Sequence, residues 1–166
     1  MIKLKNLLTE EKEAFQKEKE GKISYRIDDK YISSGRAKIW MYVSDFSNTS
    51  GAYTQDQDYE HMMGQIVLLD RVPVEDLDNK IPRRQGYLFV DSIVSNVKSQ
   101  GYGYLLYKAA LKYAQQHKFK GLISTTLHRS NDANKVWEKF KTFSDGNYDY
   151  VDIKDLGTRL KETLNS

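Results

Sequence analysis

The chain of 166 residues contains no cysteine. This absence excludes disulfide bonds, metal sites built on thiolates and a cysteine nucleophile, so catalysis would have to use oxygen or nitrogen groups. No apolar run approaches the roughly 20 residues that a membrane-spanning helix needs. Residues 1–8 also lack the long apolar core of a signal peptide. We therefore expect a cytoplasmic protein that does not bind membranes.

Proline is scarce, and low-complexity tracts and internal repeats are absent. Both prolines, Pro73 and Pro82, fall in one polar segment, residues 72–85. The composition is 39% hydrophobic and 12% aromatic, which is too apolar for a disordered chain. A chain of this length can bury roughly 70% of the surface that it exposes when unfolded. We expect a single domain over residues 1–166.

Acidic residues are missing from one long stretch. Between Ser92 and Asn131 there is no Asp or Glu, although lysine and arginine recur throughout. The net charge of the whole chain is only +3, so its composition does not require a nucleic-acid binder. The stretch indicates an anionic partner nearby, while a solvated helix face explains any single lysine equally well. The acidic loop at residues 56–61 has no metal-ligand spacing, so no metal site is expected.

Hydrophobic spacing predicts the order of the elements. Residues 23–27, 37–43, 65–69 and 87–94 are rich in β-branched and aromatic residues, which predicts strands in a largely antiparallel run. A charged helix over residues 10–20, capped by Thr9, precedes them. A helix after Gly103, a strand over 122–127, a helix over 133–140, a strand near 148–153 and a helix with Leu156, Leu160 and Leu164 in line follow. This order predicts an α/β (α+β) domain with a mixed sheet.

A glycine turn joins the strand ending near residue 94 to the helix after Gly103. Gly101 and Gly103 there would expose backbone N–H groups at the positive end of a helix, which is a site for anions. The mononucleotide loop G-x-x-x-x-G-K-[ST] is absent. A dinucleotide fingerprint would need glycine where Leu106 stands and an acid where Lys118-Phe119-Lys120 stand.

The turn Lys98-Ser99-Gln100-Gly101-Tyr102-Gly103 resembles [Q/R]-x-x-G-x-[G/A], the pyrophosphate motif of the GNAT (GCN5-related N-acetyltransferase) superfamily. Lys98 replaces the usual planar donor with an ammonium. Downstream, Asn131, Ala133 and Trp137-Glu138-Lys139-Phe140 resemble the family segment N-x-x-A-x-x-x-Y-E-K, with Asn131 displaced by one position and Trp137 in the tyrosine position. The resemblance implies a mostly antiparallel sheet with a splayed strand pair at the coenzyme site. It also implies acetyl-CoA as co-substrate and no metal.

The resemblance also implies a set of coenzyme-binding residues. The strand before the turn would pair with the pantetheine arm through its backbone, and the turn would bind the phosphates. The downstream segment would add two residues. The residues concerned are Ile93, Val94 and Ser95 on the strand, Lys98, Ser99, Gln100, Gly101, Tyr102, Gly103 and Tyr104 in the turn, and Asn131 and Trp137 downstream.

Catalysis would require a base, because an amine that is protonated at neutral pH must lose a proton before it attacks the thioester. Strand alternation places Tyr87, Phe89, Asp91 and Ile93 on one face. Asp91, the only acid on this strand, is the first candidate, although a structural role for its carboxylate is equally open. Tyr87 could instead order a water.

The acid that protonates the leaving thiolate is open, since Trp137 has no acidic proton to give. Tyr148, Tyr150 and unassisted departure all remain as alternatives.

We therefore expect an acetyl-CoA-dependent N-acetyltransferase. Its acceptor would be an amine of a protein (a lysine or N-terminus), a small molecule or an aminoacyl-tRNA. Recognition of nucleic acid would use the acid-free stretch and Arg83-Arg84. The alternative is a non-catalytic acyl-CoA-binding or protein-interaction module, and the sequence leaves a homodimer open.

Overall fold

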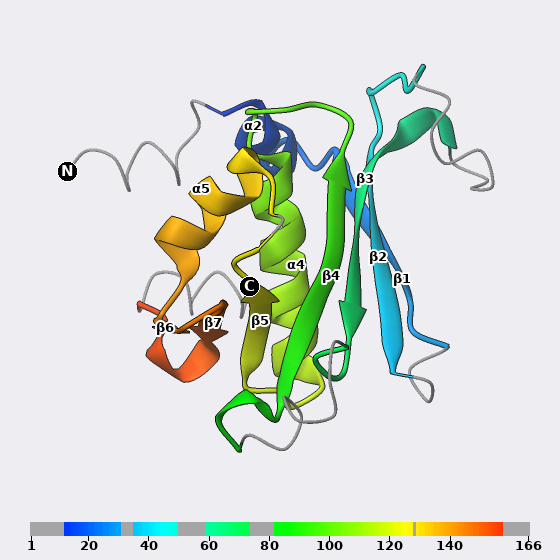
Figure 1. The fold of residues 1–166 in the computed structure, drawn as a ribbon. Coiled ribbons are helices and arrows are strands. Elements are labelled where there is room, and N and C mark those ends of the chain that lie inside the picture. The colour runs from blue at the N-terminus through cyan, green and yellow to red at the C-terminus, as the bar shows by residue number, and fades with distance from the viewer. Residues whose placement is uncertain (1–11, 31–34, 50–58, 74–81, 128, 158–166) are drawn as a thin grey trace.

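The computed structural model describes residues 12–30, 35–49, 59–73, 82–127 and 129–157. These residues form one sheet, in the order β1-β2-β3-β4-β5-β7-β6, with helices beside it (Figure 1). The strands are β1 (Ile23–Asp28), β2 (Arg36–Val43), β3 (Met62–Leu69), β4 (Tyr87–Ser95), β5 (Gly121–Thr125), β6 (Phe143–Asp145) and β7 (Tyr148–Asp152). The helices are α2 (Glu13–Lys19), α4 (Tyr102–Gln116) and α5 (Asn131–Phe140), with 3-10 turns η2 (Tyr59–His61), η3 (Pro82–Arg84) and η4 (Ile153–Asp155).

The predicted fold class is confirmed. Neighbouring strands are antiparallel except for β4 and β5, which run parallel. The predicted strands and the helices after Gly103 and around residues 133–140 are present, whereas the short strand β6 was not predicted. Lys12, not Thr9, takes the N-cap position of α2. Thr9 itself, Leu160 and Leu164 lie outside the described residues.

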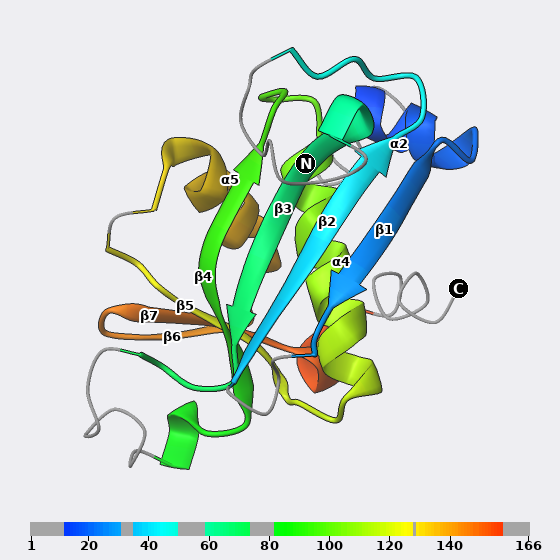
Figure 2. The same cartoon turned by 90° about the vertical axis from the view of Figure 1, so that its right-hand side faces the viewer.

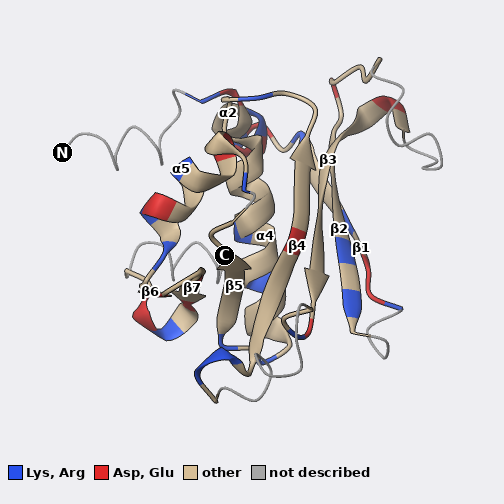
Figure 3. Cartoon of the chain, in the orientation of Figure 1, with Lys and Arg blue, Asp and Glu red and all other residues tan. Residues whose placement is uncertain are grey.

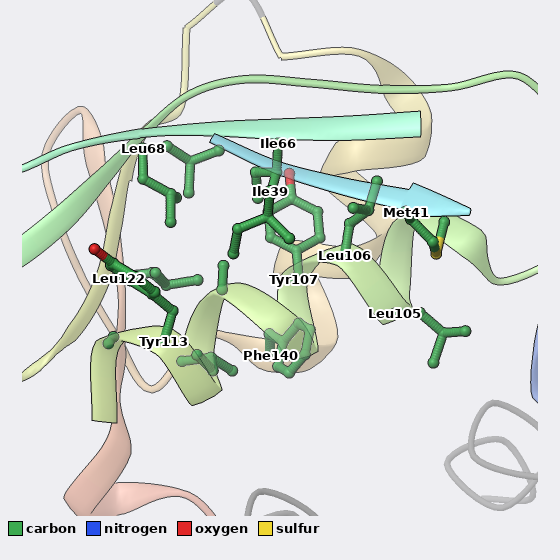
Figure 4. Close-up of a cluster of buried hydrophobic side chains, with 14 of the residues drawn as sticks. Ile39, Met41, Ile66, Leu68, Leu105, Leu106, Tyr107, Tyr113, Leu122 and Phe140 are labelled. Atoms are coloured by element: carbon green, nitrogen blue, oxygen red, sulfur yellow. The ribbon is translucent and has the colours of Figure 1, made fainter. Parts of the chain in front are cut away.

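The core lies between α4 and one face of the sheet (Figure 4). Alternate residues of β2 and β3, among them Ile39, Met41, Ile66 and Leu68, are buried toward the helix. Helix α4 meets them with a broad apolar face, which buries Leu105, Leu106, Tyr107, Ala110, Leu111, Tyr113 and Ala114. Figure 2 shows the face of the sheet that is turned away from α4, with strands β1 to β3 in front of the helix.

A β-bulge in β4 changes which face its residues occupy. Leu68 of β3 pairs with Val90, and Ile66 pairs with Ile93, so Asp91 is the extra residue between them. Val90 and Ile93 therefore both pack toward the α4 core, whereas Tyr87 and Phe89 belong to a second cluster. The predicted common face of Tyr87, Phe89, Asp91 and Ile93 is wrong, because simple alternation fails at a bulge.

Strands β4 and β5 are paired over only part of their length. Their register covers Tyr87 to Phe89 against Gly121 to Ile123, and β4 then continues to Ser95 without β5 beside it. Figure 1 shows β4 rising well past the end of β5. The unpaired part of β4 leads directly into the turn before α4, so its free edge faces the region that the resemblance assigns to the coenzyme.

Candidate active site

A cavity of about 330 Å³ lies where β4, α4, α5 and α2 converge. Its wall combines the unpaired end of β4, the turn before α4, the first turns of α4 and one side of α5. The lining residues are Lys12, Phe15, Ile93, Ser95, Val97, Lys98, Ser99, Gly101, Tyr102, Gly103, Tyr104, Tyr107, Ser130, Asp132, Ala133, Lys135, Val136, Lys139 and Phe140.

The glycine turn has the backbone geometry of an anion site. Gly101 takes the N-cap position of α4 with φ +91°, and a Cβ there would lie 3.3 Å from the Lys12 Cβ. Because the cap has no side-chain hydrogen bond, the first N–H groups of α4 are not satisfied by a capping side chain. At Gly103, an added Cβ would meet no heavy atom within 4 Å. The open space beside Gly103 gives a ligand close access to the start of a 15-residue helix.

Helix α2 holds this turn in place. The backbone N–H of Ala14 donates to the Gln100 carbonyl at 2.9 Å, and the Tyr102 hydroxyl donates to Glu13 at 2.9 Å. Burial, followed by the hydrogen bond to Glu13, raises the pKa of Tyr102. Phe15 packs edge-on against Tyr104, with ring centroids 5.4 Å apart. Helix α2 was not predicted to be part of the site, because these contacts join residues more than 80 positions apart.

The cavity is lined mainly by basic charges. Lys12 and Lys98 line it on the side of the turn, and Lys135 and Lys139 on α5, whereas Asp132 is the one acid among the described residues that line it. Figure 3 shows Lys and Arg positions, in blue, on α5 and on the segments around α2. The spacing of Lys135 and Lys139, four residues apart, places both on one side of the helix. The positive charge of the cavity therefore matches an anionic ligand. Of the four lysines, only Lys98 belongs to the acid-free stretch between Ser92 and Asn131.

Three side chains form a polar group beside the cavity. Tyr107 lines the cavity although only 2% of it is exposed, and its hydroxyl accepts a hydrogen bond from the Trp137 indole N–H at 3.1 Å. The Arg129 guanidinium lies over the Trp137 ring, 5.3 Å from its centroid. Burial raises the pKa of Tyr107 to about 12, although the Trp137 hydrogen bond and the Arg129 charge act to lower it. The phenol is therefore protonated at neutral pH.

Most of the predicted coenzyme residues lie together at this cavity. They are Ile93, Ser95, Lys98, Ser99, Gly101, Tyr102, Gly103 and Tyr104. Four others do not line it. Val94 is 40% exposed, and Asn131 is exposed at the start of α5. The Gln100 carbonyl accepts a hydrogen bond from Ala14 of α2, and Trp137 is buried beside Tyr107. The α5 lysines were missed, but their spacing on a predicted helix was a signal that could have found them.

The two predicted catalytic residues are separated by the structure. Asp91 is exposed at the bulge, two residues from Ile93, and does not line the cavity. Tyr87 lies at the other end of β4, roughly 20 Å along the strand from Ile93. Its hydroxyl donates to the buried Asp152, and burial is the main cause of its raised pKa. The geometry does not bring Tyr87 to the cavity, where it was predicted to order a water.

Tyr148, Tyr150 and Arg84 interact with one another and with Asp145 at β6 and β7. The two tyrosines were candidates for the acid, and Arg84 was a candidate for phosphate contact. The Tyr150 hydroxyl donates to Asp145 at 2.9 Å, and Arg84 lies 3.8 Å from the same carboxylate with its guanidinium over the Tyr148 ring. Tyr148 and Tyr150 are therefore placed away from the lining of the cavity. Arg84 has only 15% of its side chain exposed, which leaves little of it for a phosphate contact.

Neither a membrane helix nor a metal cluster is found in the part of the chain that the structure describes. No helix among these residues is long and apolar enough to cross a bilayer. The same residues contain no group of three or more His, Cys, Asp or Glu side chains that could hold a metal ion.

Comparison with known proteins gives structural neighbours only. No family model matches the chain, and no curated protein sequence matches it significantly. A candidate streptothricin acetyltransferase from Bacillus anthracis, solved with acetyl coenzyme A, has 15% identity and a TM-score of 0.48 over 71% of this chain. This chain covers 62% of the length of that protein.

Two further solved structures are similar in size. A ribosomal-protein-alanine N-acetyltransferase from Brucella melitensis has 11% identity and a TM-score of 0.49, with 75% of this chain and 94% of that one covered. A GNAT-family candidate acetyltransferase from Desulfovibrio desulfuricans has 11% identity and a TM-score of 0.45, with 78% and 95% covered. At these TM-scores and identities the likeness by itself assigns no function to the chain. All three neighbours are described as acetyltransferases, and one of them is placed in the GNAT family, which the turn at residues 98–103 resembles.

Proposed function

We propose that this protein is an N-acetyltransferase of the GNAT type, which transfers an acetyl group from acetyl-CoA to an amine. The observation that carries the proposal is the cavity. It joins an open helix N-terminus at Gly103, the unpaired edge of β4 and a set of lysines in one place. A pyrophosphate needs donors and positive charge, and an amide-containing arm needs free backbone groups.

The residues present fit acetyl-CoA. The N–H groups at the start of α4 would hold the pyrophosphate, with Lys98, Lys135 and Lys139 near the phosphates. The free backbone groups of Ile93 and Ser95 would pair with the pantetheine arm. The bound thioester supplies an activated acyl group, so the protein mainly needs to position an amine against the carbonyl.

Asp91 is the proposed base. Asp91 is the extra residue of the bulge, so its backbone is left out of the regular ladder, and it lies two residues from the cavity wall at Ile93. From an exposed position it can accept a proton from an ammonium directly or through one water. The acceptor would approach the exposed side of β4, whereas the coenzyme lies at its unpaired edge.

The test combines coenzyme binding with thiol release. The purified protein is mixed with acetyl-CoA and, in turn, with a protein substrate rich in lysine, a peptide with a free N-terminus, a small polyamine and an aminoacyl-tRNA. Release of free thiol that depends on one of these amines supports the proposal. Binding of acetyl-CoA without release in any mixture favours the non-catalytic coenzyme-binding module. A protein that does not bind acetyl-CoA contradicts both.

A further inference from the structure

The Tyr107 hydroxyl is buried, and it has no acceptor for its proton among the described residues. Tyr107 lines the cavity from α4, and Figure 4 shows its hydroxyl directed away from the helix toward the strands. Its oxygen already accepts the Trp137 N–H, so the remaining function of the group is to donate its own proton. Within the described residues no acceptor for that proton is found. The oxygen is therefore satisfied as an acceptor, and because Tyr107 lines the cavity, a ligand atom there can accept the remaining proton.

The surroundings of Tyr107 favour the loss of this proton during a reaction. The Trp137 N–H would stabilise the phenolate oxygen, and the positive charge of Arg129 acts in the same direction. Arg129 is held in place by Asp149 at 2.7 Å and Asn134 at 2.9 Å, with 10% of its side chain exposed. Its Nη1 is buried without a hydrogen-bond partner in the described part of the chain. The group is therefore built to support transient negative charge on a phenol that is neutral at rest.

We propose that Tyr107 protonates the thiolate that leaves when the acetyl group is transferred, with Trp137 and Arg129 as its positioning residues. This inference rests on the proposed function. The amine nitrogen forms a bond to the acetyl carbon, the carbon–sulfur bond breaks, and its electron pair goes to sulfur. Tyr107 gives its proton to that sulfur, and the proton lost by the amine restores the phenol through the base and water. The net change is thioester plus amine to amide plus thiol.

The first test measures the thiol of bound coenzyme A, without any turnover. A hydroxyl that donates to sulfur stabilises the thiolate, so the thiol pKa should be lower in the complex than in free solution. An ultraviolet titration of the bound thiolate is made with the parent protein and with Tyr107→Phe. We expect the variant to bind coenzyme A within about twofold of the parent and to show a higher thiol pKa. Equal thiol pKa values in both complexes overturn the inference.

The second test separates proton donation from packing. Tyr107→Phe should lower kcat roughly 10²-fold with little change in KM for acetyl-CoA. The loss should largely disappear with the acetyl thioester of an acidic aryl thiol, because that leaving group needs no proton. Tyr113→Phe is the matched control, since Tyr113 is buried on the same helix, bonds to Asp29 and lies outside the cavity.

Each remaining outcome decides one of the two proposals. If the parent is active and Tyr107→Phe keeps kcat within about threefold, Tyr107 is not the acid, although the transferase stands. If the parent does not bind acetyl-CoA, the proposed function fails and this assignment fails with it. Should Tyr107→Phe not fold, Trp137→Phe removes the N–H donor and keeps an aromatic ring, at the cost of some buried volume. It should then raise the pKa of the bound thiol in the same direction, and an unchanged value overturns the inference.

Discussion

Replacement of Gly103 by glutamate should separate coenzyme binding from folding. Gly103 is the second residue of α4, and an added Cβ there meets no heavy atom within 4 Å. Loss of a helical glycine stabilises a helix by about 0.5–1 kcal/mol, and a carboxylate in the first turn adds about 0.3–1 kcal/mol. The free energy of unfolding should therefore rise by about 1 kcal/mol, which corresponds to about 2–4 °C in Tm for a domain of this size.

The same side chain would fill the space proposed for the pyrophosphate and place a negative charge there. At a concentration of acetyl-CoA equal to about 100 times Kd, binding should stabilise the parent by about 2.7 kcal/mol, or about 5–10 °C in Tm. Gly103→Glu should lose this shift while its own Tm without ligand stays at or above that of the parent. The assay is thermal unfolding with and without acetyl-CoA.

A matched variant controls for the added charge. At Gly157 an added Cβ also meets nothing within 4 Å, and this residue does not line the cavity, so Gly157→Glu should keep the full shift. If Gly103→Glu shows the same shift as the parent, the coenzyme binds elsewhere and the site described above is wrong. If the parent itself shows no shift in Tm at millimolar acetyl-CoA, the protein does not bind the coenzyme that the family resemblance implies.

The remaining predictions concern proton transfer and stability. Asp91→Asn should lower kcat roughly 10²–10⁴-fold at neutral pH without changing the affinity for acetyl-CoA, and a rate within about threefold of the parent would give Asp91 a structural role. Tyr87→Phe should keep its turnover but lower the free energy of unfolding by about 1–3 kcal/mol in chemical denaturation, because Asp152 loses a donor. Burial raises the pKa of Tyr107 from 10.0 to about 12, so the unfolded chain loses this proton first and stability should fall as pH rises from about 10 to about 12. The free energy of unfolding, measured by denaturation over that pH range, should fall less steeply for Tyr107→Phe than for the parent. Equal pH dependence in the two proteins would contradict a raised pKa for Tyr107.

The elements and the turn could be predicted because their signals are local. The change from strand to helical spacing after Gly103 lies within a few residues, and it locates both β4 and α4. Gly101 is also a local requirement, since φ +91° at a helix N-cap is far easier for glycine than for other residues. Sequence therefore predicts where the anion-binding backbone lies, and the structure adds the neighbours that enclose it.

The faces of β4 could not be predicted, because register is a property of two strands. One extra residue at Asp91 moves Ile93 to the α4 side and leaves Tyr87 on the other. No pattern within residues 87–95 reveals this insertion, since it depends on how β3 pairs with β4. The wall supplied by α2 was missed for a related reason: Phe15 reaches Tyr104 through tertiary packing alone.

The role of Trp137 shows how a position-by-position comparison can find the right place and miss the chemistry. At this position the resemblance expects a phenol, and the chain has an indole that cannot give up a proton under ordinary conditions. In the structure that indole points its N–H at the hydroxyl of Tyr107 on the neighbouring helix, and the two rings pack in a T-shaped arrangement with centroids 5.7 Å apart. A proton donor is thus present at the cavity, but α4 carries it and α5 orients it. Because the Trp137 N–H of α5 meets the Tyr107 oxygen of α4, the two helices bring these side chains to one place beside the cavity. The loss of tyrosine at one position therefore argues against catalysis only if the facing position has no phenol, and here it has one.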